Sequence, residues 1–483
     1  MISFFACIVL LIVSYFTYGT LVEKSFGPPD DRETPAVALA DGVDYVVMPV
    51  WNVFLIQLLN IAGLGPIWGA VGGAMYGPAV FLWITFGTIL CGGVHDFASG
   101  FLSMRENGMS VSEISGNYMG EFMRNVMRVF SIVLLFMVGV VFAKGPAGLL
   151  AYLVKNTTHT DGLFTQEATW LIIVIVYYFI ATFMSIDKII GRIYPIFGFC
   201  LVAMAFGVSG GIILSGDVAN IPEIFPIMNY HPSGNAIWSG MFISVACGAC
   251  SGFHSTQSPI MARCLKSERS AKVVFYGAMV AEGIIAMVWA GAACALYPII
   301  EGKMTGLQEA MAQGQATCIY EVCRTTMGPV GVVLAMLGVI ACPITSGDTA
   351  FRSARLTIAD WFKIDQKDFG KRLALSAPLL LLGYLVCHLD YTAIWNYFAY
   401  TNQLLAAVVL WTGSMYLVKK GKQPWIAVVP AVFMTAVTMT YTFMGKEVLN
   451  LGAGMTSYAG GLVVTAIILG IFMFAKSKVK VVA

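Results

Sequence analysis

The sequence predicts an all-α integral membrane protein with about thirteen transmembrane helices. Hydrophobic residues make up 58% of the 483 residues and charged residues only 11%, which excludes a soluble globular protein. The apolar runs are each roughly 17 to 25 residues long, the length at which a helix crosses the ~30 Å hydrocarbon core of a bilayer. These runs lack the alternation of polar and apolar residues that barrel strands require, so helices are the expected spanning elements.

The apolar runs follow one another along the whole chain. The first run has no basic segment before it and no small-residue cleavage site after it, so we expect a retained helix rather than a signal peptide. We expect the spans near residues 2–21, 45–72, 75–101, 126–153, 168–184, 189–214, 235–260, 273–298, 326–350, 373–388, 392–417, 424–443 and 455–475.

The distribution of Lys and Arg predicts how the helices are oriented, because positive residues remain on the cytoplasmic side of a membrane. With these spans and a cytoplasmic C-terminus, all of the 28 Lys and Arg residues lie inside except Lys144, Lys155, Lys303, Arg324 and Lys446. If one span were missed or added, the Lys and Arg residues after it would move to the opposite side and the asymmetry would be lost. The sequence therefore predicts an outside N-terminus, and the net charge of +2 gives no reason to expect a nucleic-acid partner.

Two Gly-rich segments interrupt apolar runs where an ordinary membrane helix would continue. They are Asn60–Pro66 and Cys247–His254. A helix that breaks at membrane depth strands backbone N–H and C=O groups, and lipid cannot satisfy them. Such breaks persist where protein, water or a substrate supplies the missing partners, so the sequence predicts a transporter with a binding site at the two breaks.

Faint internal correspondences predict that two halves of the chain are related. Gly65 and Gly252 are separated by the same number of residues as His95 and Glu282. Each half would hold five spans, and an odd number forces the second copy to enter the membrane from the opposite side. The expected organisation is an N-terminal helix and loop, two inverted repeats, and two C-terminal peripheral helices with a basic tail, at residues 1–44, 45–214, 235–417 and 424–483.

Five longer motifs closely resemble the carbon starvation protein A family over roughly residues 45 to 415. They are Asn60–Ile67, Gly92–Phe97, Ser103–Arg105, Gly248–Pro259 and Pro343–Arg355. The resemblance implies a bacterial inner-membrane transporter with a LeuT-like core of inverted repeats, importing peptides or pyruvate together with protons under carbon starvation. Well-known members of the family are longer at the C-terminal end, and this departure leaves regulation and substrate open.

The two breaks supply the candidate substrate-binding residues. In the first break, Gly63, Gly65 and Pro66 permit an unwound segment, and the helix that follows presents free N–H groups and its positive dipole end to a carboxylate. A tight helix crossing that needs Gly for close approach is the alternative. The second break offers hydrogen-bonding side chains to a carbonyl or peptide group, although a water-filled cavity would use the same residues, Ser251, Gly252, His254, Ser255 and Gln257.

Ionisable residues inside spans are candidates for ion coupling, because a charge at bilayer depth costs at least about 2.5 kcal/mol unless it is paired or hydrated. His95, Asp96 and Glu282 have this placement. A histidine, or a buried carboxylate, can exchange a proton near physiological pH. A structural hydrogen-bonded pair is the alternative for His95 and Asp96.

Sodium coupling stays open, because Thr345, Ser346 and Asp348 gather oxygen ligands at the inner end of a span. Adjacent hydroxyl residues in this part of the second repeat resemble those of LeuT-fold sodium transporters. Lys144 lies in the related helix of the first repeat, where a basic group would replace a cation or pair with a substrate carboxylate. Pairing of Asp348 with an arginine one helical turn away is the simpler alternative.

The sequence gives little support to other functional classes, such as enzymes and metalloproteins. There is no metal-ligand spacing, phosphate loop or Ser-His-Asp arrangement, so we expect neither an enzyme nor a bound cofactor beyond H⁺ or Na⁺. Cys318 and Cys323 share a predicted external loop and could pair if that compartment is oxidising, so the sequence leaves this disulfide open. A sodium-coupled carrier of another small carboxylate or amino acid, and a passive channel, are the alternative functions. Oligomeric state is not predicted.

Overall fold

The computed structural model describes residues 1–28, 32–41, 45–183, 186–364 and 368–479. The described residues form helices and no β-strand, as the sequence predicts. In the first half of the chain the helices are α1 Ile2–Phe16, α2 Tyr18–Phe26, α3 Pro35–Ala38, α4 Val50–Ile61, α5 Gly65–Gly73, α6 Ala79–Phe86, α7 Gly93–Arg105, α8 Val111–Met119, α9 Glu121–Thr158, α10 Glu167–Ala181 and α11 Ile186–Leu214.

The second half continues with a break between α12 and α13, a bend between α16 and α17, and several long helices. These are α12 Phe242–Ser244, α13 Phe253–Ala262, α14 Gly277–Leu296, α15 Thr305–Ala312, α16 Gln315–Ala335, α17 Cys342–Phe362, α18 Phe369–Val386, α19 Tyr391–Lys419, α20 Trp425–Met444 and α21 Met455–Lys478. Short π-helical turns join several of them, at Gly87–Gly92, Ile237–Met241, Lys272–Tyr276 and Met336–Ala341.

Among the described residues, eight helices are long and apolar enough to cross a membrane. Two further pairs of consecutive helical segments are bent at a short break, one at α4–α5 and one at α16–α17. If each pair counts as one span, the number rises to ten. The predicted span at 168–184 corresponds to α10, which has only 15 residues, and the span at 235–260 is divided between α12 and α13. The chain is therefore a multi-pass membrane protein, while thirteen spans stay a prediction.

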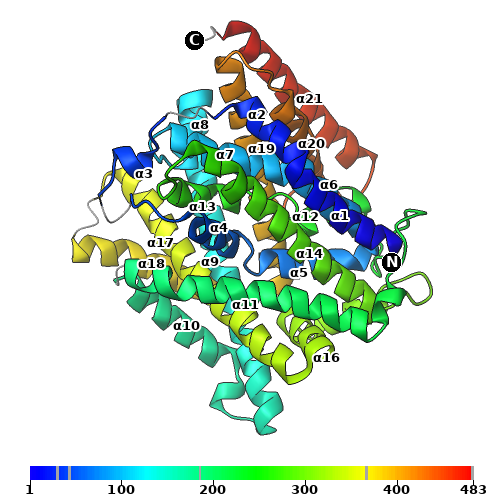
Figure 1. The fold of residues 1–483 in the computed structure, drawn as a ribbon. Coiled ribbons are helices and arrows are strands. Elements are labelled where there is room, and N and C mark those ends of the chain that lie inside the picture. The colour runs from blue at the N-terminus through cyan, green and yellow to red at the C-terminus, as the bar shows by residue number, and fades with distance from the viewer. Residues whose placement is uncertain (29–31, 42–44, 184–185, 365–367, 480–483) are drawn as a thin grey trace.

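The broken helices lie in the middle of the molecule, and long helices surround them (Figure 1). Helix α14 packs against α5, and α13 packs against α7 and α19. Helices α20 and α21 pack against each other at one edge of the bundle, and the side chains of α21 are largely exposed. The centre of the bundle thus receives residues from both halves of the chain.

The suggested disulfide bond between Cys318 and Cys323 is not present in the structure. Both residues lie within helix α16 rather than in a loop, and both are buried free thiols. Five residues along an α-helix separate two Cα atoms by about 8 Å, more than the roughly 7 Å that a disulfide spans. The polar residues around the two cysteines suggested a loop, but they form one face of a helix that packs against α9 and α11.

Candidate functional site

The first predicted break is present. Helix α4 ends at Ile61 and α5 begins at Gly65, with a bend of 48° between the two segments. Pro66 stands in the first turn of α5, where a missing N–H leaves no helical hydrogen bond unmade. The first backbone bond of α5 runs from the N–H of Trp68 to the carbonyl of Leu64 at 2.8 Å, so the preceding N–H groups have no place in the helical ladder.

The second predicted break is also present and is longer. The chain leaves helical geometry at Val245 and enters α13 at Phe253. Gly248 has φ +87°, a left-handed conformation that L-residues with a side chain rarely adopt. This glycine lets the chain reverse inside the bundle without strain.

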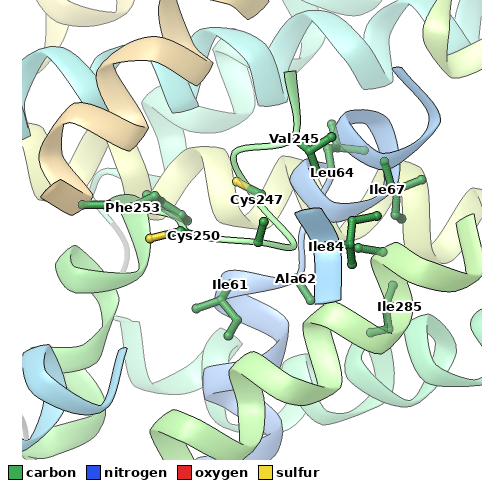
Figure 2. Packing of buried hydrophobic residues seen from close by; sticks show 14 of the residues in the cluster. Ile61, Ala62, Leu64, Ile67, Ile84, Val245, Cys247, Cys250, Phe253 and Ile285 are labelled. Carbon is green, nitrogen blue, oxygen red and sulfur yellow. The ribbon is translucent and has the colours of Figure 1, made fainter. Parts of the chain in front are cut away.

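The two breaks cross in direct contact. A Cβ atom built on Gly65 would lie 2.3 Å from the Cβ of Cys247, and one built on Gly248 would lie 3.3 Å from the Cβ of Pro66. Figure 2 shows Leu64 of the first break and Val245 and Cys247 of the second among the buried residues of this region. The crossing needs glycine at these positions, so the expected break and the alternative of a tight crossing are both features of this structure.

The hydroxyl groups of the second break mostly bond within their own helix. Ser255 donates to the carbonyl of Gly252 at 2.6 Å, and Ser258 donates to the carbonyl of His254 at 2.9 Å. The amide nitrogen of Gln257 donates to the hydroxyl of Thr256 at 3.0 Å. These side chains therefore offer a substrate fewer free donors than their number in the sequence indicates.

Asn402 of α19 holds the start of α13 and has a larger role than the sequence indicated. Its Oδ1 accepts from the N–H of Phe253 at 2.7 Å and from the hydroxyl of Ser251 at 3.1 Å. Its backbone carbonyl accepts from the N–H of Gly252 at 3.1 Å. The side chain thus caps a half-helix from a distance of about 150 residues along the chain, and only polarity in an apolar span could have marked it in the sequence.

A chain of ionisable side chains lies beside the second break. His95 Nδ1 lies 2.7 Å from Asp96 Oδ1, and Asp96 Oδ2 lies 2.9 Å from His254 Nδ1. On the other side of the ring, His254 Nε2 lies 3.3 Å from Glu282 Oε2. All four side chains are fully buried. The structure brings together residues from α7, α13 and α14 that the sequence marked separately.

Glu282 also supports the backbone of the break. Its Oε1 accepts from the N–H of Gly248 at 3.0 Å, while Thr88 donates its hydroxyl to the carbonyl of the same glycine at 2.9 Å. Both backbone groups that the break exposes at Gly248 are therefore satisfied by side chains. A change in the protonation of this carboxyl group therefore acts directly on the backbone of the broken segment.

Lys144 lies away from this cluster. Its Nζ donates to the carbonyls of Cys387 and Leu389, at 2.6 Å each, where α18 ends. The carbonyls at a helix C-terminus carry partial negative charge and lack helical partners, so a lysine stabilises them. In this structure Lys144 is a helix cap rather than a partner of the break.

We expect Lys144→Met to lower the stability of the protein more than its transport. Two charge-assisted hydrogen bonds to helix carbonyls are lost, at a cost of about 1.5–3 kcal/mol each. Thermal unfolding of the purified variant in detergent measures this loss. An unchanged melting temperature with a collapsed ion-driven accumulation ratio would instead assign Lys144 to ion coupling.

The residues predicted to hold sodium do not converge on one point. The hydroxyl of Thr345 donates to the carbonyl of Cys342 at 2.7 Å, and Asp348 lies 3.5 Å from Arg352 one helical turn away. Ser346 is buried, and its hydroxyl lies within hydrogen-bonding reach of the thiol of Cys342, one helical turn earlier. The simple arginine pairing fits Asp348.

Among the described residues, one cluster has the donor atoms for a metal ion. Cys247, His254 and Glu282 each place a ligand atom within 4.8 Å of the other two, and all three are buried. The sulfur of Cys247 also accepts from the amide nitrogen of Asn402 at 3.3 Å. The cluster lies at the crossing of the two breaks.

Comparisons with known sequences agree with the resemblance in the motifs. The family model described as carbon starvation protein CstA matches residues 1–147, 148–309 and 299–441. An uncharacterized membrane protein of Haemophilus influenzae is 38% identical, over 65% of this chain and 95% of its own length. The peptide transporter CstA of Bacillus subtilis is 25% identical, over 86% of this chain and 84% of its own.

A further relative and one solved structure extend the comparison. The pyruvate/proton symporter BtsT of Escherichia coli is 25% identical over 61% of this chain and 49% of its own length. The crystal structure of MhsT in complex with L-phenylalanine superposes with a TM-score of 0.56 at 14% identity, covering 89% of this chain and 99% of that one. At this level of identity the superposition shows a shared fold alone.

Proposed function

Because the chain belongs to the carbon starvation protein CstA family, we propose that it imports short peptides or pyruvate across the bacterial inner membrane together with protons. The relatives with assigned names are transporters and not enzymes, which places this chain among membrane transporters. The substrate class follows the names of those relatives, and both substrates carry the carboxylate that the helix breaks suit. Transport under carbon starvation follows from the family.

The crossing of the two breaks is the observation that carries this proposal. A carboxylate is stabilised by the free N–H groups and the positive dipole end at the start of α5. That helix start abuts the second break, where Gly65 meets Cys247. A substrate at the crossing would contact both breaks at once, so a rearrangement of either would change its access to the two sides of the membrane.

Related halves are consistent with alternating access. The first half begins with the broken pair α4–α5, and the second begins with the broken pair α12–α13. We take residues 45–214 and 235–417 as two inverted repeats, with residues 1–44 and 424–483 at the periphery. The likeness to MhsT in fold supports this arrangement. Rocking of one repeat against the other would open the crossing to each side in turn.

Protons are the favoured coupling ion, because four buried ionisable side chains lie in a row beside the second break. Glu282 links this row to the backbone at Gly248. Protonation of these side chains would therefore alter the hydrogen bond that Glu282 makes to the broken segment at Gly248. The alternative is a sodium-coupled carrier of another small carboxylate or amino acid, with the adjacent hydroxyls of Thr345 and Ser346 as candidate ligands.

Uptake of labelled pyruvate into proteoliposomes tests the proposal. With an inward gradient of one pH unit and one proton per substrate, we expect accumulation to about tenfold, since tenfold corresponds to about 1.4 kcal/mol. An uncoupler should return the ratio to about one, and exchange of Na⁺ for K⁺ should have no effect. Inhibition by an unlabelled dipeptide would indicate a shared site. Absence of proton-driven uptake of both pyruvate and a labelled dipeptide would contradict the proposal, and a dependence on Na⁺ would support the alternative.

A further inference from the structure

We propose that Cys247, His254 and Glu282 form a transition-metal site that takes Zn²⁺ and holds the carrier in one conformation. The three side chains come from the second break, from α13 and from α14, and their donor atoms lie within 4.8 Å of one another. A thiol, an imidazole and a carboxyl group are all common zinc ligands. The three residues are scattered over 36 positions of the sequence, so no spacing motif reveals them.

The spacing of two atoms in this cluster suits ligands of one ion. His254 Nε2 and Glu282 Oε2 are buried and form an ion pair at 3.3 Å, and Cys247 lies within 4.8 Å of both ligand atoms. With metal–ligand distances of about 2.1 Å, two ligands on a tetrahedral ion lie about 3.4 Å apart. The observed separation therefore suits two ligands of one ion.

Each ligand is held in place by its other polar contacts. The far ring nitrogen of His254 lies 2.9 Å from Asp96 Oδ2, the carboxylate–histidine arrangement that supports metal-binding histidines. The second oxygen of Glu282 accepts from the N–H of Gly248 at 3.0 Å. The sulfur of Cys247 lies 3.3 Å from the amide nitrogen of Asn402. The site is thus organised before an ion arrives.

The donor set selects the kind of ion. One sulfur, one nitrogen and one oxygen suit Zn²⁺ and Co²⁺, whereas Mg²⁺ and Ca²⁺ require oxygen ligands. A thiolate and a carboxylate together cancel the two charges of the ion, which matters in a buried site where an uncompensated charge is costly. Three protein ligands leave the fourth tetrahedral position for water.

A bound ion would connect Glu282 of α14 to Cys247 in the second break and to His254 at the start of α13. Cys247 also contacts Gly65 of the first break, so the ion would fix the crossing itself. Alternating access requires these segments to move relative to each other. Zn²⁺ should therefore inhibit transport. This consequence rests on the proposed function, whereas binding of the ion does not.

Optical titration of the purified protein with Co²⁺ tests the site directly. We expect a thiolate-to-cobalt charge-transfer band that Zn²⁺ removes by displacement. The band should be lost in Cys247→Ser and Cys247→Ala, and it should persist in Cys294→Ser, a matched control because Cys294 is a buried free thiol on the same helix as Glu282. Absence of the band in the unaltered protein, or its survival in both folded Cys247 variants, would overturn the proposal.

A transport measurement separates the site from the proposed function. At a Zn²⁺ concentration ten times the Kd from the optical titration, about nine-tenths of the protein is occupied, so uptake should fall about tenfold. The same treatment should change uptake by Cys247→Ala less than twofold, relative to its own rate without metal. A cobalt band in a protein that moves neither pyruvate nor dipeptide would retain the site and reject the proposed function. Zn²⁺ binding without inhibition would overturn the proposed conformational lock.

Discussion

Replacing Glu282 by Gln is expected to abolish proton-driven accumulation of substrate and to leave exchange across the membrane intact. With an imposed gradient of one pH unit, the accumulation ratio should fall from about ten to about one. The amide oxygen of Gln can still accept the N–H of Gly248, which the carboxyl group accepts at 3.0 Å, so the break should keep its shape. What the variant loses is the ability to take up and release a proton.

Counterflow and accumulation have to be measured on the same proteoliposomes to test this expectation. Counterflow exchanges labelled for unlabelled substrate without net proton movement, so it reports an intact binding site. Glu309→Gln is a suitable control, because Glu309 is an exposed carboxylate on α15 and belongs to neither break. Undiminished accumulation by Glu282→Gln would remove Glu282 from ion coupling and favour sodium.

Replacing Gly252 by Ala is expected to disrupt both the fold at the second break and transport. A Cβ atom at this position would lie 2.4 Å from the backbone oxygen of Asn402 and 2.7 Å from the backbone nitrogen of Ala406. Backbone atoms of α19 cannot move aside as the end of a flexible side chain can. Overpacking of this kind typically costs 1–3 kcal/mol, and about 3 kcal/mol or more is expected for a clash with backbone.

Thermal unfolding and pyruvate uptake together check this prediction. The variant should melt at a lower temperature and lose most of its uptake, since the contact of Gly252 with Asn402 positions the start of α13. Gly210→Ala on α11 is the matched control, because nothing lies within 4 Å of the added Cβ atom there. If Gly252→Ala melts and transports as the control does, the close contact between α13 and α19 is not needed for either property.

The helical breaks were predictable because their causes are local. Gly and Pro interrupt an apolar run whatever surrounds it, and the two interrupted segments appear in the structure within the predicted segments Asn60–Pro66 and Cys247–His254. The class of protein was equally accessible, because the demand for spanning helices depends on composition and on the length of apolar runs. Ionisable residues in apolar spans also stand out without any structure.

Side-chain partners were not predictable, because they depend on contacts between distant segments. Asp96 meets His254 across 158 residues, and Lys144 reaches the carbonyl of Cys387 across 243 residues. The sequence suggested that Lys144 serves the ion site, but packing of α9 against α18 places its amino group at a helix end instead. Periodicity and composition contain no information on which helices pack together.

The sequence by itself determined that this protein is a helical membrane transporter with two interrupted helices, because hydrophobic length and helix-breaking residues act within a single segment. Only the tertiary structure decided that the two breaks cross, that Asn402 caps the second of them, and that Cys247, His254 and Glu282 converge at the crossing. These features arise from the packing of α5, α13, α14 and α19, and packing is a property of the whole chain.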